Sequence, residues 1–222
     1  MLFLVGSPIG NLNDITFRAL SVLKEVTLVA AEDTRHSSIL LKRFEINKPL
    51  VSFHEHNEAR RTSELIEKMR AGEKVALLTD AGMPSISDPG YRIVRACIEN
   101  GIPVEVIPGP SAVLTALVGS GLPTDRFYFG GFLPVKSGQR ERELVAALAR
   151  EVTSVYFEST HRIIRSLEVI GKEDPTRSIC VARELTKHFE EYRRGEASTV
   201  LAHYTTHPPK GEITLIISGI RI

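Results

Sequence analysis

The sequence predicts an α/β protein made of two α/β domains, and three observations support this prediction. Short apolar runs such as residues 75–78 alternate with longer stretches in which apolar residues recur at helical spacing. Loops rich in glycine, proline and acids follow several of these runs directly, as is typical of strand ends in α/β sheets. The 222 residues exceed one typical domain of about 100–150 residues, so two small domains are expected.

The composition excludes several classes of protein. Apolar residues make up 42% and charged residues 25% of the chain, as in globular proteins, and no apolar run approaches the ~20 residues of a membrane helix. The N-terminal MLFLVG is too short and too uncharged for a signal peptide. Cys97 and Cys180 lack CxxC spacing, which indicates reduced thiols and a cytoplasmic protein. The net charge of +1 leaves any binding of nucleic acid to local basic clusters.

In the first half of the chain, strands are predicted at 2–6, 26–31, 49–53, 75–78 and 104–107. Helices are predicted after the first two strands and at 58–71, 91–100 and 111–117. Asp14 and Ser111 are predicted to cap the helices that follow them.

Three strand ends in this half carry Gly/Pro loops, at 7–12, 80–90 and 108–112, and are expected to line one crevice. The loop 80–90 is longer than the usual connection of about 2–6 residues. Its Asp80 and Asp88 stand beside small residues, which favours a ligand with positive charge or hydrogen-bond donors. The chain has no GxxxxGK[ST] loop and no GxGxxG turn after the first strand, so a triphosphate cradle, a dinucleotide fold and the common methyltransferase fold are disfavoured.

Two further strand ends carry charged residues. Glu32-Asp33-Thr34-Arg35 either forms part of a site or is a helix cap with a surface ion pair, and both interpretations stay open. His54 and His56 alternate in an extended segment, a pattern that would suit a metal. Because the spacing is not HExxH and no third ligand follows, no metal site is expected.

The segment 120–125 has the composition of a linker, which predicts an N-terminal domain of residues 1–120 and a C-terminal domain of residues 121–222. The second half is predicted to contain strands at 127–132, 152–158, 178–182 and 212–218. Helices are predicted at 139–151 and 163–170, the latter closed by Gly171, and through Val200 and His203.

Seven motifs resemble those of the ribosomal RNA small-subunit methyltransferase I (RsmI) family of the tetrapyrrole-methylase superfamily. They are SPIGNLNDIT at 7–16, AEDTR at 31–35, DAGMPSISDPG at 80–90, IPGPSA at 107–112, GFLP at 131–134, ESTHR at 158–162 and ARELTK at 182–187. They span nearly the whole chain in matching order.

The resemblance implies S-adenosylmethionine as cofactor, held in the cleft between two α/β domains of a homodimer. It also implies 2′-O-methylation of the ribose of a decoding-site cytidine in 16S rRNA, either naked or in the assembled small subunit. The implied cofactor contacts are Pro8, Gly82, Met83, Pro84, Ile86, Ser87, Asp88, Ser111, Ala112, Phe132 and Leu133. Met83 stands where threonine is common in the family, a change that a backbone contact tolerates.

A hydroxyl acceptor needs a base or a cation that stabilises the developing alkoxide. Glu158 is the predicted base, and Arg183 and Lys187 are predicted to stabilise the alkoxide or to grip phosphate. The alternative for Glu158 and Arg183 is a structural ion pair at the ends of adjacent strands. The predicted RNA contacts are Arg35, Lys136, Arg140 and Arg162.

Two other functions stay open. The same fold could methylate a ring carbon of a tetrapyrrole, although AEDTR, ESTHR and ARELTK disfavour it. The chain could also be a non-catalytic RNA-binding or ribosome-assembly module. Transfer of a labelled methyl group would separate the three.

Overall fold

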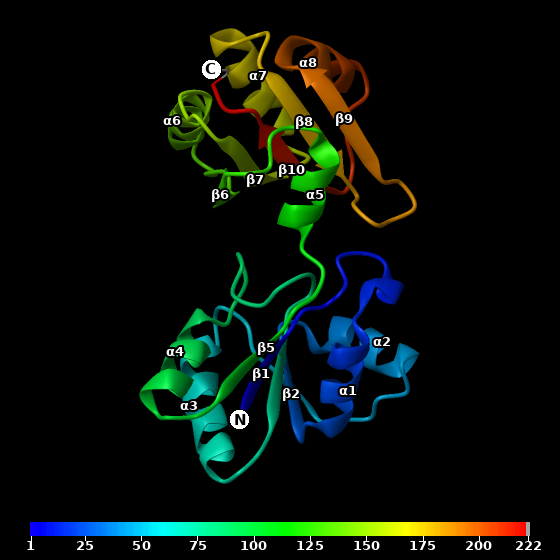
Figure 1. Cartoon of the computed structure of the whole chain (residues 1–222), viewed down its shortest axis with the longest axis vertical. Helices are drawn as coiled ribbons and strands as arrows, with labels where there is room; N and C mark the ends of the chain where they lie inside the picture. Colours follow the sequence, from blue (N-terminus) through cyan, green and yellow to red (C-terminus); the bar gives the residue numbers. More distant parts are fainter. Residues whose placement is uncertain (221–222) are drawn as a thin grey trace. The chain divides into compact units, whose positions relative to one another are not determined.

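The computed structural model describes residues 1–220, which form two compact units, Met1–Ser111 and the part from Ala112 onward (Figure 1). The division lies before the predicted boundary at residue 120. Helix α5 (Ala112–Ser120) buries Val113, Ala116 and Leu117, and it contacts strands of the second sheet. Its apolar face therefore makes it part of the second unit, and the segment 120–125 is only the connection to the next strand.

The first unit contains a parallel sheet with the strand order β3-β2-β4-β1-β5. The strands are β1 (Leu2–Val5), β2 (Leu28–Ala31), β3 (Leu50–Ser52), β4 (Val75–Leu78) and β5 (Val104–Ile107). Every residue of β1, β2 and β4 is buried, as expected of central parallel strands covered on both faces. Because all five strands run in one direction, their carboxyl ends lie along one edge of the sheet.

The helices of this unit cover both faces of its sheet (Figure 1). They are α1 (Phe17–Glu25), α2 (Thr34–Arg43), α3 (Glu58–Arg70) and α4 (Tyr91–Glu99), with a short 3₁₀ turn η1 (Leu12–Asp14) before α1. Leu2 and Leu4 of β1 pack on the α3/α4 side, and Phe3 and Val5 pack on the α1/α2 side. This alternation follows from the twofold period of a strand.

The N-caps of the first two helices differ in how well the sequence predicted them. Asp33 caps α2, because its carboxylate accepts a hydrogen bond from the backbone of Arg35. Asp14 does not cap α1. It lies inside η1, and the hydroxyl of Thr16 accepts the hydrogen bond from Ala19 instead.

The second unit contains a mixed sheet with the strand order β6-β7-β10-β8-β9. The strands are β6 (Phe127–Phe132), β7 (Thr153–Ser159), β8 (Ser178–Arg183), β9 (Glu191–Glu196) and β10 (Glu212–Ile217). Only the pair β6/β7 is parallel. The sequence analysis missed β9, since EYRRGE lacks an apolar run. It is an edge strand, where charged side chains are tolerated and discourage pairing with another chain.

Three further helices complete this unit, α6 (Ser137–Leu148), α7 (Ile163–Glu173) and α8 (Ala197–Thr206). They share one apolar core with the sheet, including Leu144, Leu167 and Tyr204. Helix α7 continues through Gly171, where the sequence analysis placed its end. No helix in the described part of the chain has the length and apolar character of a membrane span.

Candidate functional site

The first two predicted Gly/Pro corners are joined directly by backbone hydrogen bonds. The Ser7 N–H donates to Gly82 O at 2.9 Å, and the Gly82 N–H donates to Ser7 O at 3.1 Å. The buried Ser7 hydroxyl also donates to Thr79 O at 3.0 Å. These bonds hold the loop after β1 against the loop after β4, so the two corners form one structure.

The third corner approaches the first so closely that both need glycine. A Cβ added at Gly6 would lie 2.7 Å from the Gly109 Cα and 2.7 Å from the Met83 Sδ. The Gly6 N–H donates to Ile107 O at 3.2 Å, which fixes this register. Backbone from three loops therefore meets at the carboxyl ends of β1, β4 and β5, as the sequence analysis expected.

The loop 80–90 is held in conformations that L-residues rarely adopt. Ser85 and Ser87 have φ angles of +73° and +62°, and Gly82 and Gly90 have φ angles of +83° and +143°. Such residues cost free energy and persist where the surroundings dictate their conformation, often at binding sites. The loop is therefore pre-shaped.

The predicted cofactor contacts differ in exposure. Pro8, Gly82, Pro84 and Leu133 are buried, Met83, Asp88, Ser111 and Ala112 are half-buried, and Ile86, Ser87 and Phe132 are exposed. Those up to Ser111 belong to the first unit, and the others belong to the second.

A cluster of carboxylates lies beside these corners, at the ends of β2 and β4. The Asp80 N–H donates to Glu32 Oε2 at 3.3 Å, and the Asp33 N–H donates to Asp80 Oδ1 at 3.1 Å. Asp88 interacts electrostatically with both Glu32 and Asp80. Within residues 1–220, no Lys or Arg forms an ion pair with Glu32, Asp80 or Asp88.

Burial and the closeness of these carboxylates shift their pKa values. Burial, reinforced by the charge of Glu32, raises the pKa of Asp88 to about 7, although the Thr79 hydroxyl facing it opposes the shift. Burial likewise raises the pKa of Glu32, and the charge of Asp80 adds to the effect. Asp33 differs, since its hydrogen bonds to the Arg35 side chain lower its pKa to about 2.

Asp88→Asn is expected to flatten the dependence of stability on pH between about pH 4 and 7. Because the folded-state pKa of Asp88, about 7, lies above its ordinary value of 3.8, the unfolded chain loses this proton first as pH rises. The Asp88 contribution to stability is therefore present below pH 4 and is lost as pH rises through 7. Melting temperatures of both proteins from pH 4 to 8 measure this, and the variant is expected to melt higher at pH 8. Parallel profiles for the two proteins would contradict the assignment.

Arg35 forms the surface ion pair that the sequence analysis kept as an alternative. Its Nη2 lies 2.8 Å from Asp33 Oδ2, and its side chain is 89% exposed. Asp33 therefore serves as cap and ion-pair partner. The neighbouring Glu32 belongs to the carboxylate cluster. The motif AEDTR therefore supplies the helix cap and its ion pair, and also one member of the cluster.

Glu158, the predicted base, is buried, and both of its carboxylate oxygens have protein partners. Its side chain is 0% exposed, and Oε1 lies 2.8 Å from Arg162 Nη2. The Ser166 hydroxyl donates to Oε2 at 2.7 Å, and the Ser159 N–H donates to Oε1 at 2.7 Å. The predicted alternative was an ion pair between Glu158 and Arg183. The structure instead pairs Glu158 with Arg162, and Arg183 with Glu191.

Two of the predicted RNA contacts, Arg140 and Arg162, also have protein partners. Arg162 is committed to the buried pair with Glu158. Arg140 is 5% exposed and donates to the carbonyls of Pro134 and Val135. Lys136 is exposed and precedes α6. The local sequence, basic and polar, did not distinguish the inward-facing arginines from the outward-facing lysine.

Arg183 and Lys187 lie in a network of ion pairs around the ends of β8 and β10. Arg183 Nε lies 3.1 Å from Glu191 Oε2, and its Nη1 donates to Lys210 O. Lys187 Nζ lies 2.9 Å from Glu184 and 2.8 Å from Glu212. A phosphate would have to replace one of these carboxylates to bind either cation.

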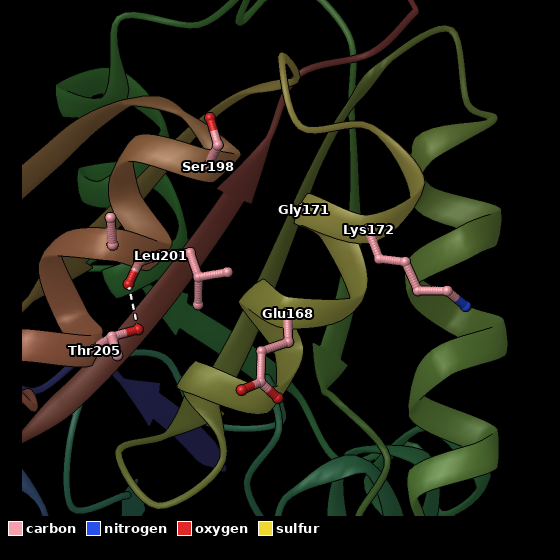
Figure 2. Close-up of a pocket in the computed structure, with 7 residues that line it drawn as sticks. Glu168, Gly171, Lys172, Ser198, Leu201 and Thr205 are labelled. Carbon is pink, nitrogen blue, oxygen red and sulfur yellow. Dashed lines mark hydrogen bonds between the residues drawn. The ribbon is translucent and has the colours of Figure 1, made fainter.

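A separate groove lies on the second unit between α7 and α8 (Figure 2). Glu168 and Lys172 of α7 and Leu201 of α8 contribute to its lining. The Thr205 hydroxyl beside them already donates to Leu201 O at 2.8 Å. Because its polar groups do not converge on one point, the groove lacks the character of a catalytic site.

Comparison with known proteins first gives the class to which the fold belongs. The model of the family "Tetrapyrrole (Corrin/Porphyrin) Methylases" matches residues 1–201. Among solved structures, a diphthine synthase aligns with a TM-score of 0.74 and 16% identity, over 98% of this chain and 89% of that chain. A uroporphyrin-III-C-methyltransferase from Thermus thermophilus aligns with a TM-score of 0.68 and 24% identity, over 98% and 93% of the chains. The two α/β units thus have the tetrapyrrole-methylase fold, as the sequence analysis predicted.

More similar relatives then define the family within this class. The ribosomal RNA small subunit methyltransferase I of Thermotoga maritima is 46% identical over 98% of this chain and 98% of its own length. The proteins of the same name from Synechocystis and Escherichia coli O157:H7 are 47% identical, and the alignments cover 79% and 77% of their lengths. The chain belongs to the ribosomal RNA small subunit methyltransferase I family.

Proposed function

We propose that this protein transfers a methyl group from S-adenosylmethionine to the ribose 2′-hydroxyl of a decoding-site cytidine in 16S rRNA. One observation carries the proposal. Relatives named ribosomal RNA small subunit methyltransferase I match 98–99% of the chain at 46–47% identity. The protein would act in the cytoplasm as a homodimer, on naked RNA or on the assembled small subunit.

The residues of the first unit fit such a cofactor. S-adenosylmethionine supplies an electrophilic methyl group on a positively charged sulfur. The corners bring backbone together at Gly6, Gly82 and Gly109, and no Lys or Arg among residues 1–220 forms an ion pair with the neighbouring carboxylates. A ligand that carries one positive charge would compensate them.

The cofactor would be held by residues of the three corners, with Phe132 and Leu133 as further contacts. The proposed contacts are Pro8, Gly82, Met83, Pro84, Ile86, Ser87, Asp88, Ser111, Ala112, Phe132 and Leu133. A rigid loop suits this role, because methyl transfer requires an in-line approach at roughly 3–3.5 Å and depends on positioning. The fixed backbone of 82–90 supplies such positioning before any ligand arrives.

On the RNA side, exposed cations are the groups available for phosphate contacts. Arg35 and Lys136 meet this requirement, since both are exposed. Arg183 and Lys187 would contribute by exchanging a carboxylate partner for a phosphate. Each such contact would add to the salt dependence of binding.

Transfer of a tritiated methyl group tests the proposal directly. Incubation with labelled S-adenosylmethionine and small ribosomal subunits that lack the modification is expected to label 16S rRNA. Because a 2′-O-methyl group protects the adjacent phosphodiester from alkali, the label should appear in an alkali-resistant dinucleotide. Label in mononucleotides, label only in an added porphyrinoid, or RNA binding without transfer would each contradict the proposal.

A further inference from the structure

The strand order of the first sheet divides its carboxyl edge into two neighbouring parts. The Gly/Pro corners follow β4, β1 and β5, whereas the charged segments beginning at Glu32 and His54 follow β2 and β3. Neighbouring strands lie about 4.8 Å apart, so the second part begins one strand away from the proposed cofactor loop. Asp80, at the end of β4, belongs to both parts.

Glu32 is held in place on this second part, but only through one of its oxygens. Its backbone N–H donates to Leu78 O at 3.2 Å, and its Oε2 accepts from the Asp80 N–H at 3.3 Å. Its Oε1 accepts no hydrogen bond from any residue in the described range 1–220. Asp80 is held in the same way, since its Oδ1 accepts from the Asp33 N–H.

His54 is fixed in one tautomer by Asn57. The Asn57 Oδ1 accepts from the His54 backbone N–H at 2.9 Å, and its Nδ2 donates to Ser52 O at 3.3 Å. Because a backbone N–H only donates and a carbonyl only accepts, this orientation of the amide is determined. The amide nitrogen also lies 3.1 Å from His54 Nε2, which must therefore accept. The proton of the neutral ring is then on Nδ1.

One buried polar atom beside the carboxylates has no hydrogen-bond partner within residues 1–220, His54 Nδ1. His54 is also close enough to Glu32 to lower the pKa of that carboxyl, against the effect of burial. Thr79, which is 2% exposed, faces Asp88 with its hydroxyl and so already has a carboxylate beside it. Buried polar groups are rarely left unsatisfied, so His54 Nδ1 points to a ligand.

We propose that Glu32 is the base that accepts the proton of the RNA hydroxyl, with the His54 Nδ1–H as a hydrogen-bond donor to the acceptor. The inference rests on the proposed function and adds to it the residues that contact the RNA hydroxyl. The acceptor oxygen bonds to the methyl carbon while the carbon–sulfur bond breaks and leaves its electron pair on sulfur. The O–H proton passes to Glu32 Oε1.

The charge of the site supports this assignment. Before transfer, the carboxylates face one positive charge on sulfur, and after transfer they hold one proton instead. The net charge of the carboxylates and the cofactor sulfur taken together is therefore unchanged through the reaction. Burial raises the pKa of Glu32, which makes it a stronger base than an exposed glutamate.

Glu32→Gln tests the proposal, with Glu55→Gln as the matched control because Glu55 is exposed in the loop after β3. Methyl transfer to small subunits is expected to fall by about 100-fold or more in Glu32→Gln, the usual contribution of a general base. Its affinity for S-adenosylmethionine, measured by calorimetry, should fall far less than transfer does, because Asp80 and Asp88 remain to face the positive charge of the cofactor. Transfer within about threefold of the control, or a parallel loss of cofactor affinity, would overturn the inference.

A second measurement does not depend on activity. Calorimetry in two buffers of different ionisation enthalpy, at pH 6.5, gives the protons released when S-adenosylmethionine binds. The cationic cofactor should displace protons from the carboxylates of the wild type and of Glu55→Gln, and fewer from Glu32→Gln. The product S-adenosylhomocysteine, whose sulfur carries no charge, should release almost none.

The two measurements separate the possible failures. If the wild type does not methylate RNA, the proposed function fails, and proton release still tests whether Glu32 belongs to a cofactor-linked cluster. Equal proton release from Glu32→Gln and the wild type would overturn its place in that cluster. If the wild type and Glu32→Gln both methylate RNA, only the base is wrongly assigned.

Discussion

Glu158→Ala is expected to lower the free energy of unfolding of the second unit by about 3–5 kcal/mol, the usual cost of removing one partner of a buried ion pair. The substitution removes the carboxylate that pairs with Arg162 Nη2 at 2.8 Å and accepts from the Ser166 hydroxyl. The remaining guanidinium is only 18% exposed and would be left without its partner. Urea unfolding followed by circular dichroism measures the change.

Glu141→Ala is the matched control, because Glu141 is an exposed glutamate of the same unit. It should change stability by no more than about 0.5 kcal/mol. Glu158→Ala/Arg162→Ala should lose less than the sum of the two single variants, since removing both charges leaves no uncompensated ion. Equal stability of Glu158→Ala and Glu141→Ala would contradict the structural role.

Glu158→Ala also distinguishes a structural role of Glu158 from a catalytic one. If Glu158 only stabilises the second unit, methyl transfer per folded molecule should survive at a temperature at which the variant is folded. A loss of turnover in fully folded Glu158→Ala, with cofactor affinity unchanged, would restore Glu158 as the base and contradict Glu32.

The sequence predicted those parts of the fold that depend on local patterns. The strands at 75–78, 104–107 and 127–132 have the predicted limits, because short apolar runs bounded by turn residues leave little choice. The convergence of the Gly/Pro corners also followed from the rule that parallel strands expose their carboxyl ends at one edge. The helix cap at Asp33 was one of two interpretations that the sequence left open, and the structure confirms it.

Other features depend on contacts that no local pattern reveals. Strand β9 is polar and forms only because β8 supplies a pairing edge. Glu158 was predicted as the base and Arg162 as an RNA contact, and only the packing shows that Glu158 is buried against Ser166 and pairs with Arg162. Glu32 and His54 were each noticed in the sequence, but only the strand order shows that the strands they follow, β2 and β3, are neighbours and that β2 lies beside β4. Their common role could not be predicted without it.

Gly109→Ala is expected to lower the free energy of unfolding of the first unit by about 3 kcal/mol, near the upper end for overpacking. The added Cβ would lie 2.8 Å from the Gly6 Cα and 3.0 Å from the Gly6 carbonyl carbon and oxygen. All three atoms belong to backbone, so no flexible side chain can move away. The loop after β5 would have to separate from the loop after β1, and the affinity for S-adenosylmethionine should fall with it.

Gly138→Ala is the matched control, since Gly138 lies in α6 and a Cβ there would meet nothing within 4 Å. Alanine has the higher helix propensity, so this variant should be unchanged or more stable, by up to about 1 kcal/mol. Urea unfolding and calorimetric titration with the cofactor measure both effects. A Gly109→Ala protein with wild-type stability and affinity would show that the two corners tolerate separation, and that their close approach does not form the cofactor site.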